Sequence, residues 1–297
     1  MTSFVRTVLG DVHPSELGVT YCHEHLIIDS PIVAERFPHI HLPSVAEALA
    51  EATLCQRAGV GTMVDAMPEG GREIDRLREI SRQTGIHIVS ASGLHTEKYY
   101  EFPLAESPEV LASRFVAEIE SGCGVIKVAT GPEGVNERAR SVFKAASIAH
   151  GQTGAPILTH CEEGQGGLEQ LALLSDLSVN LDRVVLSHTD KLVDEVYHRD
   201  LLDSGVNLEY DQSLRQAGAE DQTTAWLVIS MVEAGFLGQL MLGTDGARRT
   251  LWRTLGGSPG LAWLFEGFVP ILEDLGLGEI ELMALLIDNP ARWLKFS

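Results

Sequence analysis

The sequence predicts an α/β fold, a single (β/α)8 barrel of the TIM-barrel type. Three observations predict it: short apolar, β-branched runs alternate with amphipathic helical stretches, eight such runs can be counted, and each run is apolar almost throughout. Strands of this kind are buried on both faces, as they are when helices cover a barrel whose side chains fill its interior. A length of 297 residues suits one such barrel, so we expect residues 1–297 to form a single domain.

The predicted strands follow one another at the spacing that βα units require. They cover residues 20–28, 61–67, 87–94, 125–130, 156–161, 183–188, 206–210 and 239–244. A doubly wound open sheet is the alternative, but neither GxGxxG nor GxxxxGK[ST] follows the first strand. A closed barrel is therefore favoured.

The helices between the strands have recognisable ends. Ser44-Val-Ala-Glu47 predicts a capping box, and Pro108 after Ser107 predicts the first turn of another helix. Glycines that follow helical runs predict C-terminal ends at Gly59, Gly85, Gly151 and Gly205.

Charge and composition narrow the range of partners. The formal net charge is −20, from 42 acidic and 22 basic residues, and no Lys/Arg-rich run is present, which disfavours nucleic acid and anionic membranes as partners. The sequence lacks a signal-peptide pattern at its start and any apolar stretch long enough to span a bilayer. We expect a cytoplasmic enzyme that acts on a small molecule. Four scattered cysteines without CxxC spacing are expected to be reduced and buried.

Polar residues that can bind metals are concentrated at the C-terminal ends of the predicted strands, where barrel enzymes place their active sites. His23 and His25 end the first strand and point to the same side of it. His160, His188 and Asp245 end the fifth, sixth and eighth strands. Imidazole and carboxylate ligands suit zinc, and also manganese, cobalt or iron.

Lys127 lies in the middle of the fourth strand, between apolar residues. A buried amine tends to lose its proton, and a neutral amine can react with carbon dioxide to form a carbamate able to bridge two metals. The alternative is that Lys127 extends to the rim of the barrel and stays charged. The spacing is compatible with both.

Each of these residues by itself has an ordinary structural explanation, such as a core histidine or, for Asp245 before a glycine, a turn residue. Their joint placement is what indicates a metal site. The remaining histidines that we place lie in predicted loops or helices: His13, His39, His41, His150 and His198.

The order His23-x-His25, Lys127, His160, His188, Asp245 resembles that of the phosphotriesterase-like family of the amidohydrolase superfamily, and the resemblance extends over nearly the whole chain. It implies two divalent cations, with His23, His25 and Asp245 holding the more buried one and His160 and His188 the more exposed one. Carboxylated Lys127 and a hydroxide would bridge them. The bridging hydroxide would be the nucleophile, and Asp245 would accept its proton as the catalytic residue.

Within that family, residues 243–249 and 256–260 are similar to members that open sugar lactones, including phosphorylated ones. Arg248 and Arg249 follow a predicted metal ligand and could bind a phosphate or carboxylate, or could instead form salt bridges. The family's lactonases also place a tyrosine over the metals after the third strand. Tyr99 or Tyr100 is the candidate for that position, although both could simply pack.

The leading hypothesis is therefore lactone hydrolysis. Phosphotriester hydrolysis is the alternative, but it favours apolar subsites, and the charged residues Glu97, Lys98, Arg248 and Arg249 are expected near the mouth. A deaminase or cyclic amidase of the same superfamily and a non-catalytic binding protein are further alternatives. The resemblance implies a homodimer, and the apolar residues 261–268 could form either its interface or part of the barrel's own packing.

Overall fold

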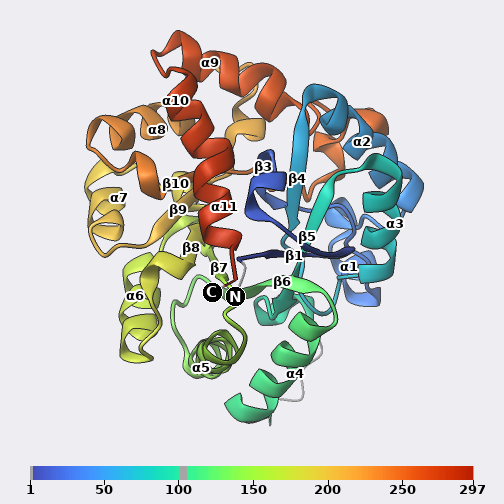
Figure 1. The fold of residues 1–297 in the computed structure, drawn as a ribbon, viewed down its shortest axis with the longest axis vertical. Coiled ribbons are helices and arrows are strands. Elements are labelled where there is room, and N and C mark those ends of the chain that lie inside the picture. Colours follow the sequence, from blue (N-terminus) through green and yellow to red (C-terminus); the bar gives the residue numbers. More distant parts are fainter. Residues whose placement is uncertain (1–2, 101–105, 297) are drawn as a thin grey trace.

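A computed structural model describes residues 3–100 and 106–296. In the described part, eight parallel strands form one sheet in sequence order, each hydrogen-bonded to the next (Figure 1). The strands are β3 (Val19–Glu24), β4 (Val60–Asp65), β5 (His87–Gly93), β6 (Cys123–Thr130), β7 (Ile157–Cys161), β8 (Val184–Ser187), β9 (Asn207–Tyr210) and β10 (Leu240–Leu242). The predicted (β/α)8 barrel is confirmed, and the eight strands occur at the predicted places.

The sheet closes where the chain segment after β10 meets β3. The backbone N–H groups of Thr244 and Asp245 both donate to the carbonyl oxygen of His23, at 2.9 and 3.0 Å. Glu24 reinforces this junction, because its carboxyl group accepts hydrogen bonds from the Thr244 hydroxyl and from the Gly246 backbone at 2.9 Å. A Cβ atom at Gly246 would lie 2.4 Å from that carboxyl group, so the junction requires glycine. The contacts that close the barrel thus also fix Asp245 beside His23.

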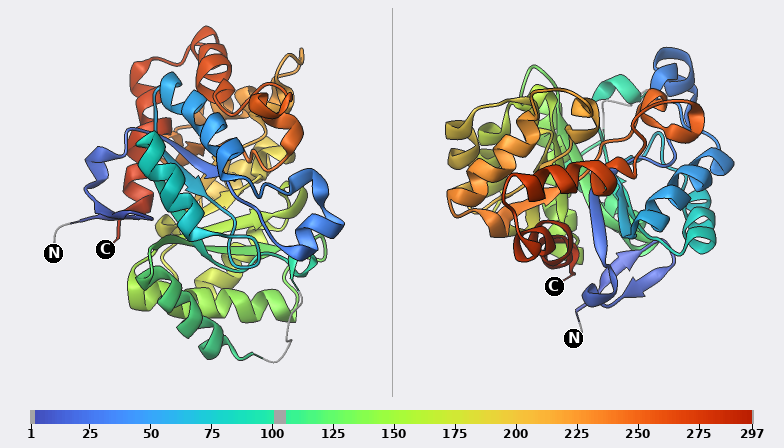
Figure 2. Two further views of the ribbon diagram at one scale, coloured as in Figure 1. Left: turned by 90° about the vertical axis from the view of Figure 1, so that its right-hand side faces the viewer. Right: turned by 90° about the horizontal axis from the view of Figure 1, so that it is seen from above.

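Helices surround the barrel on its outside (Figures 1 and 2). They are α1 (Pro31–Arg36), α2 (Val45–Ala58), α3 (Ile74–Thr84), α4 (Pro108–Glu120), α5 (Glu137–Thr153), α6 (Gly167–Asp176), α7 (Glu195–Leu202), α8 (Thr223–Glu233), α9 (Val269–Asp274), α10 (Glu279–Met283) and α11 (Asn289–Leu294). A hairpin of β1 (Val5–Thr7) and β2 (Gly10–Val12) lies at the N-terminal end of the barrel, where the Val8 N–H donates to the Ile88 carbonyl at 2.8 Å.

The core has two parts. The larger cluster lies between the sheet and the helices, and a smaller cluster fills the barrel interior with one buried side chain from most strands. Its members include Cys22, Val64, Val89, Val125, Leu158, Val185 and Met241, with Val5 and Trp293 alongside them. Because this cluster fills the interior, a small molecule can reach the strand ends only from the C-terminal side.

Most predicted helix ends are found, with one error. Ser44 caps α2 by accepting a hydrogen bond from the Glu47 backbone at 3.3 Å, and Ser107 and Pro108 begin α4. Gly59 and Gly85 end their helices in the left-handed region, and Gly205 follows α7 shortly after its last residue. The prediction for Gly151 is wrong, because α5 continues to Thr153 and ends at Gly154 with φ 75°. An exposed glycine inside a helix costs too little to end it.

The four cysteines are free and buried, as expected. None of the helices in the described part of the chain is both long and apolar enough to cross a membrane.

Candidate metal centre

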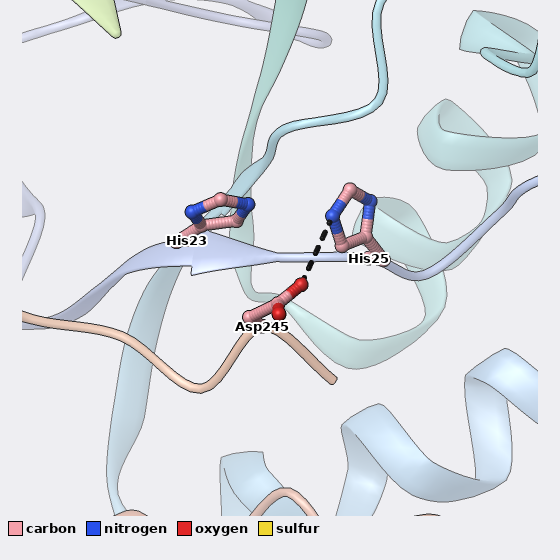
Figure 3. A group of neighbouring side chains, drawn as sticks. All are labelled: His23, His25 and Asp245. Atoms are coloured by element: carbon pink, nitrogen blue, oxygen red, sulfur yellow. Dashed lines mark ion pairs between the residues drawn. The ribbon is translucent and has the colours of Figure 1, made fainter. Parts of the chain in front are cut away.

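The six predicted ligand residues meet at the C-terminal mouth of the barrel. Each is buried, with 9% or less of its surface exposed. They are His23 in β3, His25 directly after it, Lys127 in β6, His160 in β7, His188 after β8 and Asp245 after β10. Figure 3 shows His23, His25 and Asp245 facing one another, and the His25 Nε2 atom lies 3.5 Å from Asp245 Oδ1.

The imidazoles form a continuous series across the mouth. The ring centroids of His23 and His25 lie 5.3 Å apart, those of His23 and His188 4.7 Å, and those of His188 and His160 4.4 Å. Distances of this size bring the ring nitrogens of four histidines, from three strand ends, around a shared space.

The backbone at two of these residues is strained. His188 has φ 67° and Asp245 has φ 42°, in the left-handed region that residues with a Cβ atom rarely adopt. Such conformations cost about 1–3 kcal/mol each and persist where surrounding contacts impose them, often at functional sites. At Asp245 the imposing contacts are those that close the barrel.

Burial sets the protonation of the site. It lowers the pKa of His25 to about 4 and also lowers the pKa of His23, His160 and His188. Burial opposes ionisation of Asp245, but the nearby Arg215 guanidinium and His188 outweigh it and hold the pKa of this carboxyl below its usual range. Neutral imidazoles and an ionised carboxylate are the forms that bind metal ions.

Lys127 is the unusual member of the set. Its Nζ atom lies 3.4 Å from Ser187 Oγ, and burial lowers the pKa of the amine to about 8 although Glu209 and Asp211 favour its charged form. The structure therefore places Lys127 among the other candidate ligands and does not extend it to the exposed rim.

Among the described residues, two groups of side chains have ligand atoms within 4.8 Å of one another, as a metal ion requires. One is His23, His25 and Asp245, and the other is His23, His188 and Asp211. In the described part of the chain, the buried Nδ1 atom of His25 has no hydrogen-bond partner, whereas that of His23 lies 3.4 Å from Asp211 Oδ2 and 3.5 Å from Glu209 Oε2. Unpaired buried donors or acceptors are costly, so these residues fit a site completed by divalent cations.

These six residues form the floor of a cavity of about 640 Å³, and residues of the loops that follow the strands form its rim. The structure divides the predicted tyrosine pair. Tyr99 lines the cavity and packs edge-on against His95 at 4.8 Å. Tyr100 lines a neighbouring cavity, and its hydroxyl oxygen accepts a hydrogen bond from the His95 backbone.

The predicted arginine pair is divided in the same way. Arg248 lines the cavity and is exposed, and its side chain has no hydrogen-bond or ion-pair partner in the described part of the chain. Arg249 points elsewhere, with its Nη1 atom 3.3 Å from Glu47 Oε2 and 3.1 Å from the His41 carbonyl oxygen. Arg249 thus forms a salt bridge, which was the alternative to anion binding predicted for both arginines.

Several residues of the site were not predicted. They are His95, Glu209, Asp211, Arg215 and Lys191. His95 packs edge-on against His160 with ring centroids 4.5 Å apart, and Arg215 donates to Asp245 Oδ2 at 2.7 Å. A usable signal was present in Asn207-Leu-Glu-Tyr-Asp211, since acidic residues in a buried strand and directly after it require partners.

A (β/α)8 barrel with buried histidines and aspartate at its C-terminal mouth defines a class of metal-binding barrel proteins. The sequence profile of the phosphotriesterase family matches residues 3–294, and the chain belongs to that family. The predicted family is thereby confirmed.

Individual relatives agree with this assignment. The chain is 29% identical to a phospho-furanose lactonase of Mycoplasmopsis synoviae, over 99% of this chain and 92% of that protein. It is 30% identical to a phosphotriesterase homology protein of Mycobacterium tuberculosis, over 97% and 96% of the two chains. The crystal structure of a lactonase from Listeria monocytogenes superposes with a TM-score of 0.93 at 27% identity, covering 99% of each chain.

Proposed function

We propose that this protein is a metal-dependent hydrolase that opens a lactone ring, most favourably that of a phosphorylated sugar lactone. One observation carries the proposal: a single cavity has the candidate metal ligands at its floor and, at its rim, the guanidinium of Arg248, which is unpaired among the described residues. The names of the two lactonase relatives support the same substrate class.

We propose two divalent cations per chain, zinc first, with manganese, cobalt or iron as alternatives. His23, His25 and Asp245 would bind the more buried cation and His160 and His188 the more exposed one. A carbamate on Lys127 would bridge them, and the buried, weakly basic amine supports that modification. When bound, the cations would lower the pKa of water and polarise the carbonyl group under attack.

The chain's own groups would handle the proton. Asp245 is ionised, so a carboxylate oxygen can accept the proton of the attacking water and later deliver it to the ring oxygen that leaves. Arg215 lies 2.7 Å from Asp245 Oδ2 and holds this carboxylate in place. The same ion pair makes the Asp245 carboxylate a weak base. Asp245 can therefore accept the proton only from a water whose pKa has also been lowered.

The rim would select a charged substrate. Arg248 and Lys191 both line the cavity, and neither has an ion-pair partner in the described residues. In a chain of net charge −20, unpaired cations at a cavity mouth favour an anionic group on the substrate. A guanidinium fork suits phosphate in particular.

The alternative, phosphotriester hydrolysis, fits the cavity less well. Its lining includes Lys98, Glu162, Glu163 and Arg248, whereas three uncharged ester groups need apolar subsites. Triester turnover is therefore expected only as a slow side activity. Deamination or cyclic amide opening would use the same floor and is distinguished by its products.

We also propose a single-domain, cytoplasmic homodimer. The assembly rests on the family resemblance, because Leu261, Leu264 and Phe268 of the candidate interface are fully buried within their own chain. Light scattering after gel filtration measures the mass of the assembly directly.

The function is tested by assaying the zinc-loaded protein on matched five-membered sugar lactones with and without a terminal phosphate. A neutral phosphotriester and a cyclic amide serve as comparison substrates. We expect metal-dependent acid release from lactones, with the phosphorylated one showing the higher kcat/KM. A protein with two bound metals that opens no lactone would overturn the proposal.

A further inference from the structure

We infer that Asp211 is a positioning residue that orients two of the proposed metal ligands, His23 and His188, at the same time. The inference rests on the proposed function, because it concerns imidazoles that would bind different cations. Asp211 directly follows β9 and is fully buried. Nothing in the order of the six predicted ligands points to it.

A single oxygen atom of Asp211 faces both rings. Its Oδ2 atom lies 2.6 Å from His188 Nδ1 and 3.4 Å from His23 Nδ1. Neither contact is aligned as a hydrogen bond, so both are contacts at ion-pair distance. Asp211 is therefore the carboxylate shared by the two histidines that we assign to the more buried and the more exposed cation.

The other side of the carboxylate is held by the protein. Asp211 Oδ1 accepts a hydrogen bond from the side-chain amide of Gln212. The backbone N–H of Gln212 in turn donates to Asp190 Oδ2 at 2.9 Å, and the Thr224 hydroxyl donates to the same oxygen at 2.8 Å. Asp211 thus has little freedom to turn away from the histidines.

Orientation of the rings follows from this arrangement. An imidazole whose Nδ1 edge faces a carboxylate presents its Nε2 edge to the opposite side, and the carboxylate makes that nitrogen a better electron donor to a metal. One carboxylate would do this for a ligand of each cation. Affinities for the two ions should therefore fall together when Asp211 is changed.

Glu209 offers a matched control. It lies on the same strand and is fully buried, and its Oε2 atom is 3.5 Å from His23 Nδ1. No ion pair joins it to His188 in the described part of the chain. Glu209 also lies close to Asp211 and Lys127, so a change at Glu209 should disturb the His23 ion more than the His188 ion.

The test is a titration of metal-free wild type, Asp211→Asn and Glu209→Gln with Co²⁺, followed by visible absorption and by competition with a chromophoric chelator. For Asp211→Asn we expect both dissociation constants to rise roughly 10- to 100-fold and both absorption bands to change. For Glu209→Gln we expect a clearly larger change in one dissociation constant than in the other. Circular dichroism of the metal-free proteins checks that each variant folds.

A second variant covers the case in which Asp211→Asn fails to fold. Gln212→Leu keeps the carboxylate but removes the amide that holds it, so both affinities should fall by a smaller factor. Wild-type affinity and spectrum in folded Asp211→Asn, or in Gln212→Leu where Asp211→Asn does not fold, would overturn the inference alone. A wild type that binds no Co²⁺ would overturn the proposed metal centre and the inference with it.

Discussion

The floor and the rim of the cavity are built on different principles. At the floor, each candidate ligand lies in a strand or shortly after it, and the barrel brings residues as distant as His23 and Asp245 into contact. At the rim, neighbours in sequence have unlike surroundings: Tyr99 and Arg248 line the cavity, while Tyr100 and Arg249 support the loops. Position along the chain thus indicates the role of a floor residue but not that of a rim residue.

The largest expected effect tests the floor. Lys127→Ala removes the proposed bridge between the cations, so we expect fewer than two metals per chain and a loss of kcat exceeding about 100-fold, beyond that of a supporting residue. Elemental analysis and lactone assays measure both. Lys98→Ala is the control at the rim and should keep two metals. Two tightly bound metals in Lys127→Ala would refute the bridge.

Arg215 lines the cavity and forms an ion pair with Asp245 at its floor. Arg215→Met removes the guanidinium that lowers the pKa of Asp245, so that pKa should rise. Because the carboxylate must be ionised, activity should be lost at a higher pH as the solution is acidified. The profile of kcat/KM against pH for the zinc-loaded enzymes measures this shift. An unchanged acidic limb would show that Asp245 does not limit the rate there.

Variants of Arg248 and Arg249 should distinguish substrate binding from stabilisation of the loops. Arg248→Met is expected to raise KM for a phosphorylated lactone by about 10- to 100-fold, the value of a charged hydrogen bond, and to leave the unphosphorylated lactone unaffected. Arg249→Met should change KM less than about twofold, because the contacts it loses, with Glu47 and the His41 carbonyl, lie away from the cavity. Equal effects in the two variants would contradict the division of the rim.

The smallest effects are expected at the tyrosine pair. Tyr99→Phe should lower kcat/KM by about 2- to 10-fold if its hydroxyl contacts substrate. Tyr100→Phe removes the acceptor for the His95 backbone and should cost about 1 kcal/mol of unfolding free energy without changing kcat. Chemical denaturation and steady-state kinetics on both variants distinguish the two roles. Loss of activity in Tyr100→Phe alone would reverse the assignment.

Much of the fold could be predicted because its signals are local. Alternating apolar runs located all eight strands, and Ser44, Ser107, Gly59 and Gly85 marked helix ends. The prediction that α5 ends at Gly151 was wrong. A glycine ends a helix only where its backbone is left-handed, and in α5 the left-handed residue is Gly154. Which of two nearby glycines adopts the left-handed conformation depends on where the chain must leave the helix to enter the next strand.

The supporting residues of the site were harder to predict. Asp211 and Glu209 lie at the end of a strand where nothing in the sequence identifies their partners, which come from β3 and β8. His95 and Arg215 follow strands as the predicted ligands do, but they are single residues without a partner in a recognisable spacing. Their contacts appear only when neighbouring strands are brought together.

The sequence by itself determined the barrel, its family and the positions of six candidate ligands in or just after the strands. Strand alternation and the common direction of parallel strands fix where those side chains emerge. The tertiary structure decided which tyrosine and which arginine line the cavity, and that Asp211 serves two histidines. Loop direction and burial depend on contacts between distant segments, such as Arg249 with Glu47, and local sequence does not encode them.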